Sequence, residues 1–400
     1  MTAHPRLPPR APTARPDIRS TPPARWLLEA PLTEEACRAT FDGVSSLTIG
    51  VEDEVMLLHP ENLDLLPADP AILARIADRP RFRREFVASQ LEIGAPVCRD
   101  AGEAARELRQ GRRELEEALR GRARLAAAGV HPFAPAVGEL TPGGRFARLA
   151  EEYRWAGPRA LVSALQVHVA LPGSDRALAV FNALRSYLPE LAALAGNAPL
   201  HEGVDTGLAS VRPKLCEHLP RQGLPPALES WAELIALLEW GRAGALFPDA
   251  TQLWWELRLH PGFGTLEIRV PDAQTTPHDC AGVIAVAHGL VAWLAERHDA
   301  GERLPVHPTV RIAENRWRAL RHGLHGRMVD LDTGRPESTR ERLWRLLEDI
   351  RPAAERIGSG PELSHARSLL AGNGADRQRA LAGELGLTGL VRHMADAFSG

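Results

Sequence analysis

Pairs of polar residues recur at alternate positions in five segments of the sequence, each flanked by apolar residues. The pairs are Glu52 and Glu54, Gln90 and Glu92, Gln166 and His168, Arg258 and His260 with Glu256 before them, and Glu267 and Arg269. Side chains two positions apart on a β-strand point to the same face, and the residue between them points to the other. The pattern therefore predicts five strands that each have a polar face, and it places Asp53 on the face opposite to Glu52.

If these polar faces belong to one sheet, they form a channel in which carboxylates lie beside a histidine and arginines. Its lining consists of Glu52, Glu54, Glu92, Glu267, His168, Arg258 and Arg269. Carboxylates at that density repel one another unless a cation lies between them, and Mg²⁺ commonly bridges carboxylates to substrate phosphates. Guanidinium groups bind phosphates bidentately. The pattern favours metal-assisted phosphoryl chemistry; the alternative is a solvated outer face on which Glu and Arg pair across strands.

The wider sequence predicts an α+β layer. Apolar residues alternating with polar ones predict strands at 47–58, 85–95, 161–171, 253–260 and 265–270. The last two are joined by four residues rich in Gly and Pro, which is a hairpin signal. Helical periodicity predicts helices at 102–128, 174–195, 230–240, 278–296, 309–322 and 338–357. Because most strands are not separated by single helices, we expect an antiparallel sheet with helices on one side.

Composition excludes several classes of protein. The 400 residues carry 48 basic and 51 acidic side chains, so there is no general basic field and we expect neither a nucleic-acid nor a membrane partner. Lys214 is the only lysine, and its Arg-Pro-Lys-Leu context excludes a P-loop. Four widely spaced cysteines form no metal or disulfide framework, which favours a cytoplasmic protein. The longest apolar run, 281–295, is too short to span a bilayer and predicts a buried helix.

The beginning of the chain differs in composition from the rest. Its first 24 residues hold seven prolines and four arginines with almost no large apolar side chain. Such a segment cannot bury enough surface to offset the conformational entropy that it would lose on folding. We therefore predict a disordered Pro/Arg-rich tail over residues 1–40, followed by a single catalytic domain over residues 41–400.

Seven sequence blocks, in order along the chain, resemble the bacterial glutamate–cysteine ligase type 2 family, the carboxylate–amine ligases. The blocks are residues 50–54, 89–99, 167–169, 205–212, 254–258, 265–274 and 374–379. The first reads Gly-Val-Glu-Asp-Glu, and the sixth reads Thr-Leu-Glu-Ile-Arg-Val-Pro-Asp-Ala-Gln. The resemblance extends from about Leu47 to Arg379, which is nearly the whole chain apart from the tail.

The resemblance implies a glutamine-synthetase-like fold, in which a curved antiparallel sheet forms a funnel with helices packed on its outer face. ATP would enter at one end and glutamate at the other, with two or three Mg²⁺ or Mn²⁺ ions between them. ATP would phosphorylate the γ-carboxylate, and the amine of a second substrate, typically cysteine, would attack the acyl phosphate. The implied partners are a glutamate-like acid and an amino acid or amine, and a homodimer is possible.

Residue roles are implied by position in the family's motifs. The implied metal ligands are Glu52, Glu54, Glu92, His168 and Glu267. Arg269 matches the arginine at the transferring phosphoryl group, and with Glu267 it forms the implied catalytic pair. Arg258 is a further ATP contact. Arg212 matches the arginine that holds the α-carboxylate of glutamate, and Gln166 lies where the family has a ligand or substrate contact.

Three departures from the family pattern bear on the substrates. Asp53 replaces a glutamate on the face away from the ligands, and Gln166 replaces the first histidine of a His-Val-His motif. Val211 and Cys216 replace two aromatic residues near Arg212, so a different amine or acid is consistent with the sequence. Two alternatives remain: a guanidino-kinase-like phosphotransferase of the same superfamily, and a catalytically weakened homologue that serves as a binding subunit or biosynthetic partner.

Overall fold

The described part of the computed structural model covers residues 32–400, so most of the predicted tail lies outside the described residues. Helix α2 (Glu34–Asp42) begins before the predicted boundary at residue 41, which corrects that boundary for residues 34–40. Thr33 caps the helix by accepting a hydrogen bond from the Ala36 N–H at 3.1 Å. Cys37 and Phe41 lie one turn apart on the helix and are buried in the main core. This apolar stripe anchors α2 to the folded protein.

Seven antiparallel strands form the main sheet, in the order β2-β3-β1-β5-β9-β8 with β4 beside β1. Their bounds are β1 Ile49–Leu58, β2 Phe82–Arg84, β3 Gln90–Gly94, β4 Arg124–Ala126, β5 Leu165–Ala170, β8 Leu257–His260 and β9 Thr265–Ile268. The predicted strands are all present, although each is shorter than predicted. Two separate ladders pair β6 (Leu200–His201) with β7 (Val204–Asp205) and β10 (Arg327–Val329) with β11 (Pro336–Ser338).

The register of the main sheet brings the polar pairs together on one face. Residues directly opposite each other are Glu54 and Glu92, Glu52 and Gln166, His168 and Glu267, and Arg258 and Glu267. Opposed residues in an antiparallel pair have Cβ atoms about 4.5–5.5 Å apart. The polar side chains therefore form one continuous surface across β3, β1, β5, β9 and β8, as the sequence pattern predicts.

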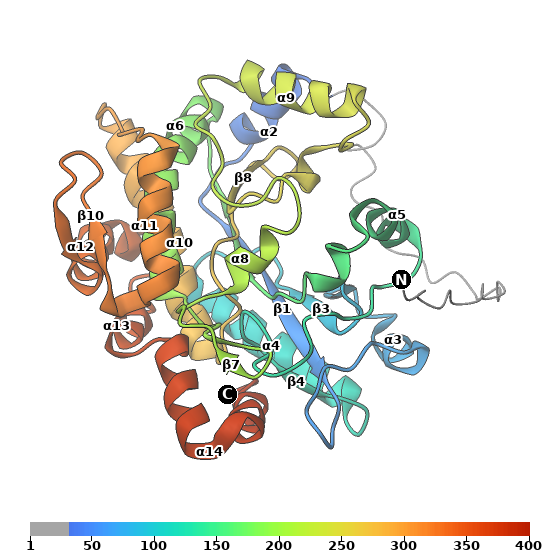
Figure 1. The fold of residues 1–400 in the computed structure, drawn as a ribbon. Coiled ribbons are helices and arrows are strands. Elements are labelled where there is room, and N and C mark those ends of the chain that lie inside the picture. The colour runs from blue at the N-terminus through green and yellow to red at the C-terminus, as the bar shows by residue number, and fades with distance from the viewer. Residues whose placement is uncertain (1–31) are drawn as a thin grey trace, which may run out of the picture.

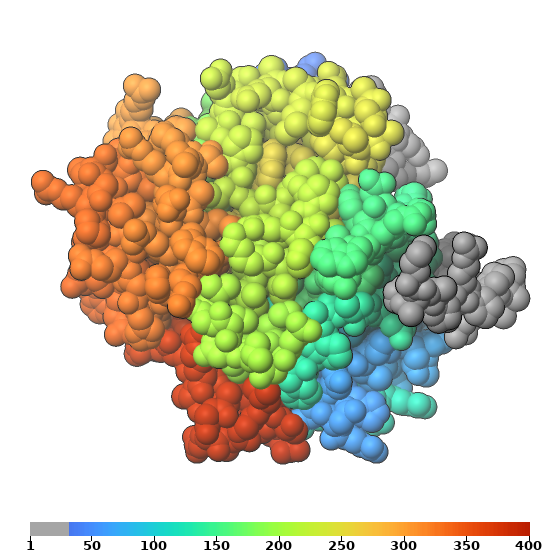
Figure 2. All heavy atoms as spheres, viewed as in Figure 1, coloured from blue at the N-terminus to red at the C-terminus, as the bar shows by residue number. Residues whose placement is uncertain are grey.

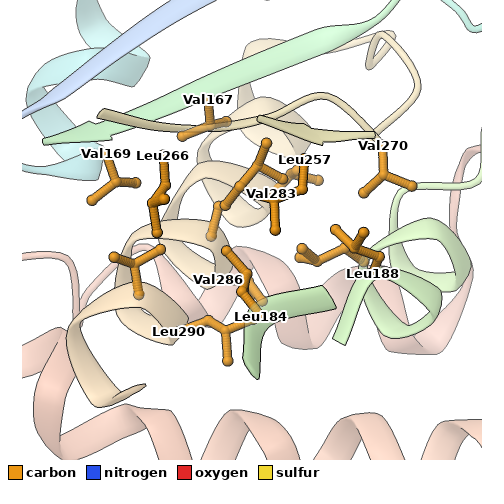
Figure 3. Close-up of a cluster of buried hydrophobic side chains, with 14 of the residues drawn as sticks. Val167, Val169, Leu184, Leu188, Leu257, Leu266, Val270, Val283, Val286 and Leu290 are labelled. Carbon is orange, nitrogen blue, oxygen red and sulfur yellow. The ribbon is translucent and has the colours of Figure 1, made fainter. Parts of the chain in front are cut away.

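The other face of these strands packs on helices. Figure 3 shows side chains such as Val167 and Leu266 pointing from the strands toward Val283 and Val286 of α10 (Pro277–Asp299). Helices α6 (Ser174–Leu184), α7 (Leu188–Leu194) and α4 (Ala101–Leu119) extend this layer, and α11 (Thr309–His322), α12 (Thr339–Arg356) and α13 (Leu363–Ala371) lie beyond it (Figure 1). The predicted α+β class, with helices packed on one face of an antiparallel sheet, is confirmed.

Segments between residues 200 and 260 cover the sheet on the side seen in Figures 1 and 2, between the C-terminal helices and the N-terminal strands. They include α8 (Arg212–Cys216), whereas α9 (Trp231–Ala243) lies at the top of Figure 1 and packs on α2. The remaining described helices are α3 (Pro70–Ile76), α5 (Gly144–Tyr153) and α14 (Gly374–Asp396).

Helix α10 is long and apolar enough to cross a membrane, and it is the one helix among residues 32–400 that meets this condition. However, 89% of its most apolar window is buried inside the protein. It packs between the sheet and helices α12 and α13. The core therefore accounts for its apolar composition, and the predicted buried helix is confirmed.

Two predicted helices are interrupted. The helix predicted at 102–128 ends at Leu119, because Gly121 adopts a φ of +72° and the chain returns as β4. The helix predicted at 174–195 is divided into α6, a 3₁₀ turn and α7, with Pro189 in the first turn of α7. By contrast α11 has the predicted bounds, and Ser338 caps α12 by accepting a hydrogen bond from the Glu341 N–H at 3.4 Å.

Candidate active site

Glu52, His168 and Glu267 meet on the polar face of the sheet, each from a different strand. One donor atom of each lies within 4.8 Å of the other two. His168 Nε2 is 3.9 Å from Glu52 Oε2, and it is buried without a hydrogen-bond partner among the described residues. Its other ring nitrogen, Nδ1, lies 3.0 Å from Thr265 Oγ1. If Nδ1 donates to Thr265, the Nε2 lone pair is directed at the two carboxylates.

The chemistry of these three donors fits a divalent cation. An unpartnered buried nitrogen costs free energy unless something binds it, and the two carboxylates supply negative charge beside it. Two carboxylates with one imidazole suit Mg²⁺ or Mn²⁺, since carboxylate oxygens are the preferred ligands of both ions. Glu52, His168 and Glu267 could therefore hold such an ion.

Glu267 is neutralised by two arginines. Arg258 Nε donates to Glu267 Oε2 at 2.7 Å, and Arg269 Nη1 donates to Glu267 Oε1. Burial by itself would raise the pKa of Glu267, but Arg258 and Arg269 outweigh burial and hold this pKa well below its ordinary value. The Glu267 carboxylate is therefore charged at any physiological pH, and a bound cation would share its oxygens with the two arginines.

Gln166 links the Glu54 carboxylate to the Arg269 guanidinium. Its Nε2 donates to Glu54 Oε1 at 2.7 Å, and its Oε1 accepts a hydrogen bond from Arg269 Nη1. Arg269 is thus held by both Gln166 and Glu267. Its Nε and Nη2 groups make no hydrogen bond to any residue between 32 and 400, and its side chain is 21% exposed. These two groups are the free donors of the arginine.

Three carboxylates on the same face lack comparable neutralisation. Burial raises the pKa of Glu54 to about 7, and the charge of Glu85 adds to this effect. Burial also raises the pKa of Glu85, and it raises the pKa of Glu92 well above its ordinary value, with a further contribution from Glu52. A raised carboxyl pKa means that the site disfavours negative charge. A bound cation would reverse this, so the electrostatics agree with the donor chemistry.

Two residues close to these carboxylates, Arg83 and Glu85, are absent from the site residues predicted from the sequence. Arg83 lies opposite Glu92 in the register, and its Nη1 is 2.9 Å from Glu92 and 3.5 Å from Glu52. Glu85 follows it, just after β2 ends. The predicted strand at 85–95 does not begin until Gln90, so alternation along that segment gave no signal that Glu85 reaches the site.

Arg212 lies close enough to Glu54 to act on its charge, and it forms a buried ion pair. Its Nε donates to Asp272 Oδ1 at 2.7 Å, and its Nη2 donates to the Val270 carbonyl oxygen at 2.5 Å. Asp272 also accepts hydrogen bonds from Ser210 Oγ at 2.9 Å and from the Asn197 N–H at 2.7 Å. The Nη1 group of Arg212 makes no hydrogen bond to the described residues. Its predicted contact with a substrate carboxylate stays a prediction, and Nη1 is the group that could make it.

Arg258 and Glu256 both form hydrogen bonds to other groups of the protein. The Nη1 of Arg258 donates to the Thr251 carbonyl oxygen at 2.7 Å, in addition to the bonds with Glu267. Glu256 accepts from Arg316 of α11 at 2.6 Å. Arg258 therefore positions Glu267 and the segment before β8, and its predicted contact with ATP stays a prediction.

A model of the glutamate–cysteine ligase family 2 matches residues 48–387, which include every strand of the polar face. The chain belongs to this family. A relative from Rubrobacter xylanophilus, named "Putative glutamate--cysteine ligase 2-3", is 37% identical over 89% of this chain and 98% of its own length. One from Mycolicibacterium vanbaalenii, named "Putative glutamate--cysteine ligase 2-1", is 34% identical over 86% of this chain and 90% of its own length. The resemblance seen in the sequence blocks is thereby confirmed.

Two solved structures share the fold of this family member. The glutamate–cysteine ligase of Francisella tularensis, in complex with AMP, superposes with a TM-score of 0.66 at 12% identity, over 89% of this chain and 90% of that chain. A bifunctional glutathione synthetase from Pasteurella multocida gives the same TM-score at 15% identity over 92% of this chain. This chain spans only 53% of the bifunctional protein. The described residues therefore have the same fold as these two proteins.

Proposed function

We propose that this family member is an ATP-dependent carboxylate–amine ligase that forms a γ-glutamyl amide through an acyl phosphate. The observation that carries the proposal is the Glu52, His168 and Glu267 cluster beside the free donors of Arg269. The relatives are named as ligases, and the Francisella tularensis ligase structure contains AMP. Family membership and shared fold support ATP-dependent ligase chemistry in general; the intermediate and the product are the proposal.

The proposed reaction needs activation because a carboxylate is a poor electrophile. An oxygen of the γ-carboxylate attacks the terminal phosphorus of ATP, the bond to the bridging oxygen breaks, and ADP leaves. The amine nitrogen then attacks the acyl carbon, the carbon–oxygen bond to phosphate breaks, and the nitrogen loses a proton. Negative charge gathers between the phosphates and the carboxylate during the first step, so catalysis depends on positive groups fixed in place.

The residues of the site are suited to distinct parts of this reaction. Glu52, His168 and Glu267 would hold a divalent cation, which would supply charge neutralisation at the transferring phosphoryl group. Arg269 would donate to that group through Nε and Nη2, while Gln166 and Glu267 keep its guanidinium oriented. No side chain has to form a covalent bond to substrate.

The acid would lie toward the Glu54 end of the face. Arg212 is near enough for its charge to act on the Glu54 carboxyl, whose pKa it lowers against the larger effect of burial. A guanidinium is well shaped to hold the α-carboxylate that does not react, and Nη1 of Arg212 has the free hydrogen-bonding capacity. This assignment rests on the proposed function.

Trapping the intermediate tests the proposal. The protein is incubated with Mg²⁺, ATP, glutamate and hydroxylamine without any other amine. An acyl phosphate is captured as a hydroxamate, with one ADP released for each hydroxamate formed. Omission of glutamate is the control. ADP release without hydroxamate would contradict the acyl phosphate, and the absence of both would favour a catalytically weakened homologue. A panel of amines, cysteine first, then identifies the second substrate.

A further inference from the structure

Phe263 presents an exposed aromatic ring next to the metal-binding cluster. It lies in the turn between β8 and β9 and is 56% exposed. Its ring is stacked on that of His260, with centroids 4.2 Å apart and an interplanar angle of 6°. His168, one of the three cluster residues, lies at 5.9 Å from the same ring in an edge-on arrangement. One face of Phe263 is thus covered by His260, and much of the side chain remains open to solvent.

The turn fixes the position of this ring. The N–H groups of Phe263 and Gly264 both donate to the His260 carbonyl oxygen, at 3.1 and 3.0 Å, which places the two stacked side chains three residues apart in a tight turn. Gly264 has a φ of +65°, and a Cβ at this position would lie 2.9 Å from the Thr40 carbonyl oxygen and 2.6 Å from Val44. The turn is therefore seated against the end of α2, which limits movement of the ring.

The proposed position of the acid indicates which part of the nucleotide would lie near Phe263. His168 lies opposite Gly50 near the start of β1, whereas Glu54, on which the charge of Arg212 acts, lies four residues further along the strand. Four residues of a strand span about 13 Å. In phosphoryl transfer the attacking and leaving oxygens are roughly in line with phosphorus. An acid at the Glu54 end therefore requires the ADP portion of the nucleotide at the end where His168 and Phe263 lie.

We propose that Phe263, backed by His260, is the platform on which the adenine base of ATP stacks. This inference rests on the proposed function and deepens it by naming the residue that receives the base. An exposed, rigid aromatic ring provides a flat apolar surface, and bases stack on such rings whatever their hydrogen-bonding pattern. The phosphates would extend from the base toward Glu52, His168 and Glu267, which the ring adjoins.

Calorimetric titration with ATP and with inorganic triphosphate tests this inference, because only ATP carries a base. ATP and inorganic triphosphate are each titrated, with Mg²⁺, into the wild-type protein and into the Phe263→Ala and Phe263→Trp variants. Phe263→Ala should raise the Kd for ATP about 5- to 150-fold and leave the Kd for triphosphate unchanged. Phe263→Trp should restore ATP binding. The matched control is Trp344→Ala, which removes an aromatic residue that is 49% exposed on α12, and it should leave both Kd values unchanged.

The outcomes separate the base platform from the proposed function. If the wild-type protein binds ATP and Phe263→Ala binds it equally well, the platform is wrong and the ligase proposal stands. If Phe263→Ala weakens triphosphate as much as ATP, the ring supports the cluster around His168 and does not receive a base. If the wild-type protein binds neither ligand, both proposals are overturned. Thermal melting of each variant confirms that it is folded, which is expected because the Phe263 ring is largely exposed.

Discussion

Neighbouring carboxylates on the two faces of strand β1 differ in the partners that the protein supplies to them. Asp53 is fully buried and its Oδ2 accepts a hydrogen bond from Arg112 Nε at 2.8 Å. The other donors of Arg112 reach the Phe398 and Gln274 carbonyl oxygens at 2.9 and 2.8 Å. One residue earlier, Glu52 is partly exposed and faces His168 Nε2, which has no partner among the described residues.

This difference indicates that the charge of Asp53 stabilises the fold, whereas the charges on the polar face can bind a ligand. On the helix-covered face, the protein supplies the counter-charge to Asp53 and binds most of the donors of Arg112 itself. On the polar face, burial raises the pKa values of Glu54, Glu85 and Glu92 in spite of the nearby arginines. A cation bound from solution would complete the second face, whereas on the first Arg112 already supplies the counter-charge to Asp53, although Asp53 Oδ1 accepts no hydrogen bond from the described residues.

The largest effect is expected on the helix-covered face. Asp53→Asn should lower the free energy of unfolding by about 3–5 kcal/mol, because it leaves the buried Arg112 charge without a counter-ion. Chemical denaturation of the purified variant measures this. A double variant that replaces Asp53 with Leu and Arg112 with Met should recover a large part of the loss, since no charge is then left buried. Wild-type stability in the single variant would show that this pair does not hold the face together.

Glu52→Gln should have the opposite profile, with loss of activity at nearly unchanged stability. Loss of an outer-shell partner of a metal ligand typically reduces metal affinity or activity by about 10–100-fold. Loss of a direct ligand such as Glu52 should reduce activity at least as much. We therefore expect ADP release to fall by about 100-fold or more. The control is Glu103→Gln in the first turn of α4, a partly exposed carboxylate that pairs with Arg99 away from the polar face, which should retain full turnover. Equal ADP release by Glu52→Gln and the wild-type protein would remove Glu52 from the cluster.

The raised pKa of Glu54 predicts a pH dependence of stability. The folded protein keeps this carboxyl protonated up to about pH 7, whereas the unfolded chain loses the proton near pH 4.5. The folded state therefore binds more protons between these values, and stability falls as pH rises through the window. Without divalent cations, the wild-type protein should lose up to about 3 kcal/mol more between pH 4.5 and 7.5 than Glu54→Gln does. Denaturation curves at both pH values give the two slopes; parallel slopes would contradict the raised pKa.

Arg83 should give the smallest effect. It is 53% exposed and bonds to Glu92 and Glu52, so it competes with a cation for these carboxylates. Exposed ion pairs contribute about 0.2–1 kcal/mol, so Arg83→Met should bind Mn²⁺ up to about fivefold more tightly. Arg99→Met, which removes an exposed ion pair with Glu103, should leave Mn²⁺ affinity unchanged. Weaker Mn²⁺ binding by Arg83→Met would mean that Arg83 organises the site.

Alternation along the strands was sufficient to predict the polar face. The period of a strand is two, so Glu52 and Glu54 had to share a face that Asp53 does not, and β5 and β9 follow the same rule. The cross-strand register that brings His168 opposite Glu267 then follows from burial of the apolar face.

Contacts between distant segments could not be predicted in this way. Arg212 pairs with Asp272, which is 60 residues away, and neither residue lies in a strand whose period would bring them together. Arg83 belongs to a three-residue strand at the edge of the sheet, too short to show alternation. Most of helix α2 falls within the predicted tail over residues 1–40, and its apolar stripe has only Cys37 and Phe41 as buried members, too few to indicate a packed helix. In each case tertiary packing, and not local pattern, decides the placement.

The central claim is that the polar face holds a divalent cation between Glu52, His168 and Glu267. Anomalous diffraction from a crystal of the protein grown with Mn²⁺ tests it most directly, because manganese can be located independently of the protein atoms. We predict an anomalous peak in coordinating contact with His168 Nε2 and with a carboxylate oxygen of both Glu52 and Glu267. A crystal in which these three residues adopt the present arrangement, with manganese bound elsewhere and none at this position, would contradict the account.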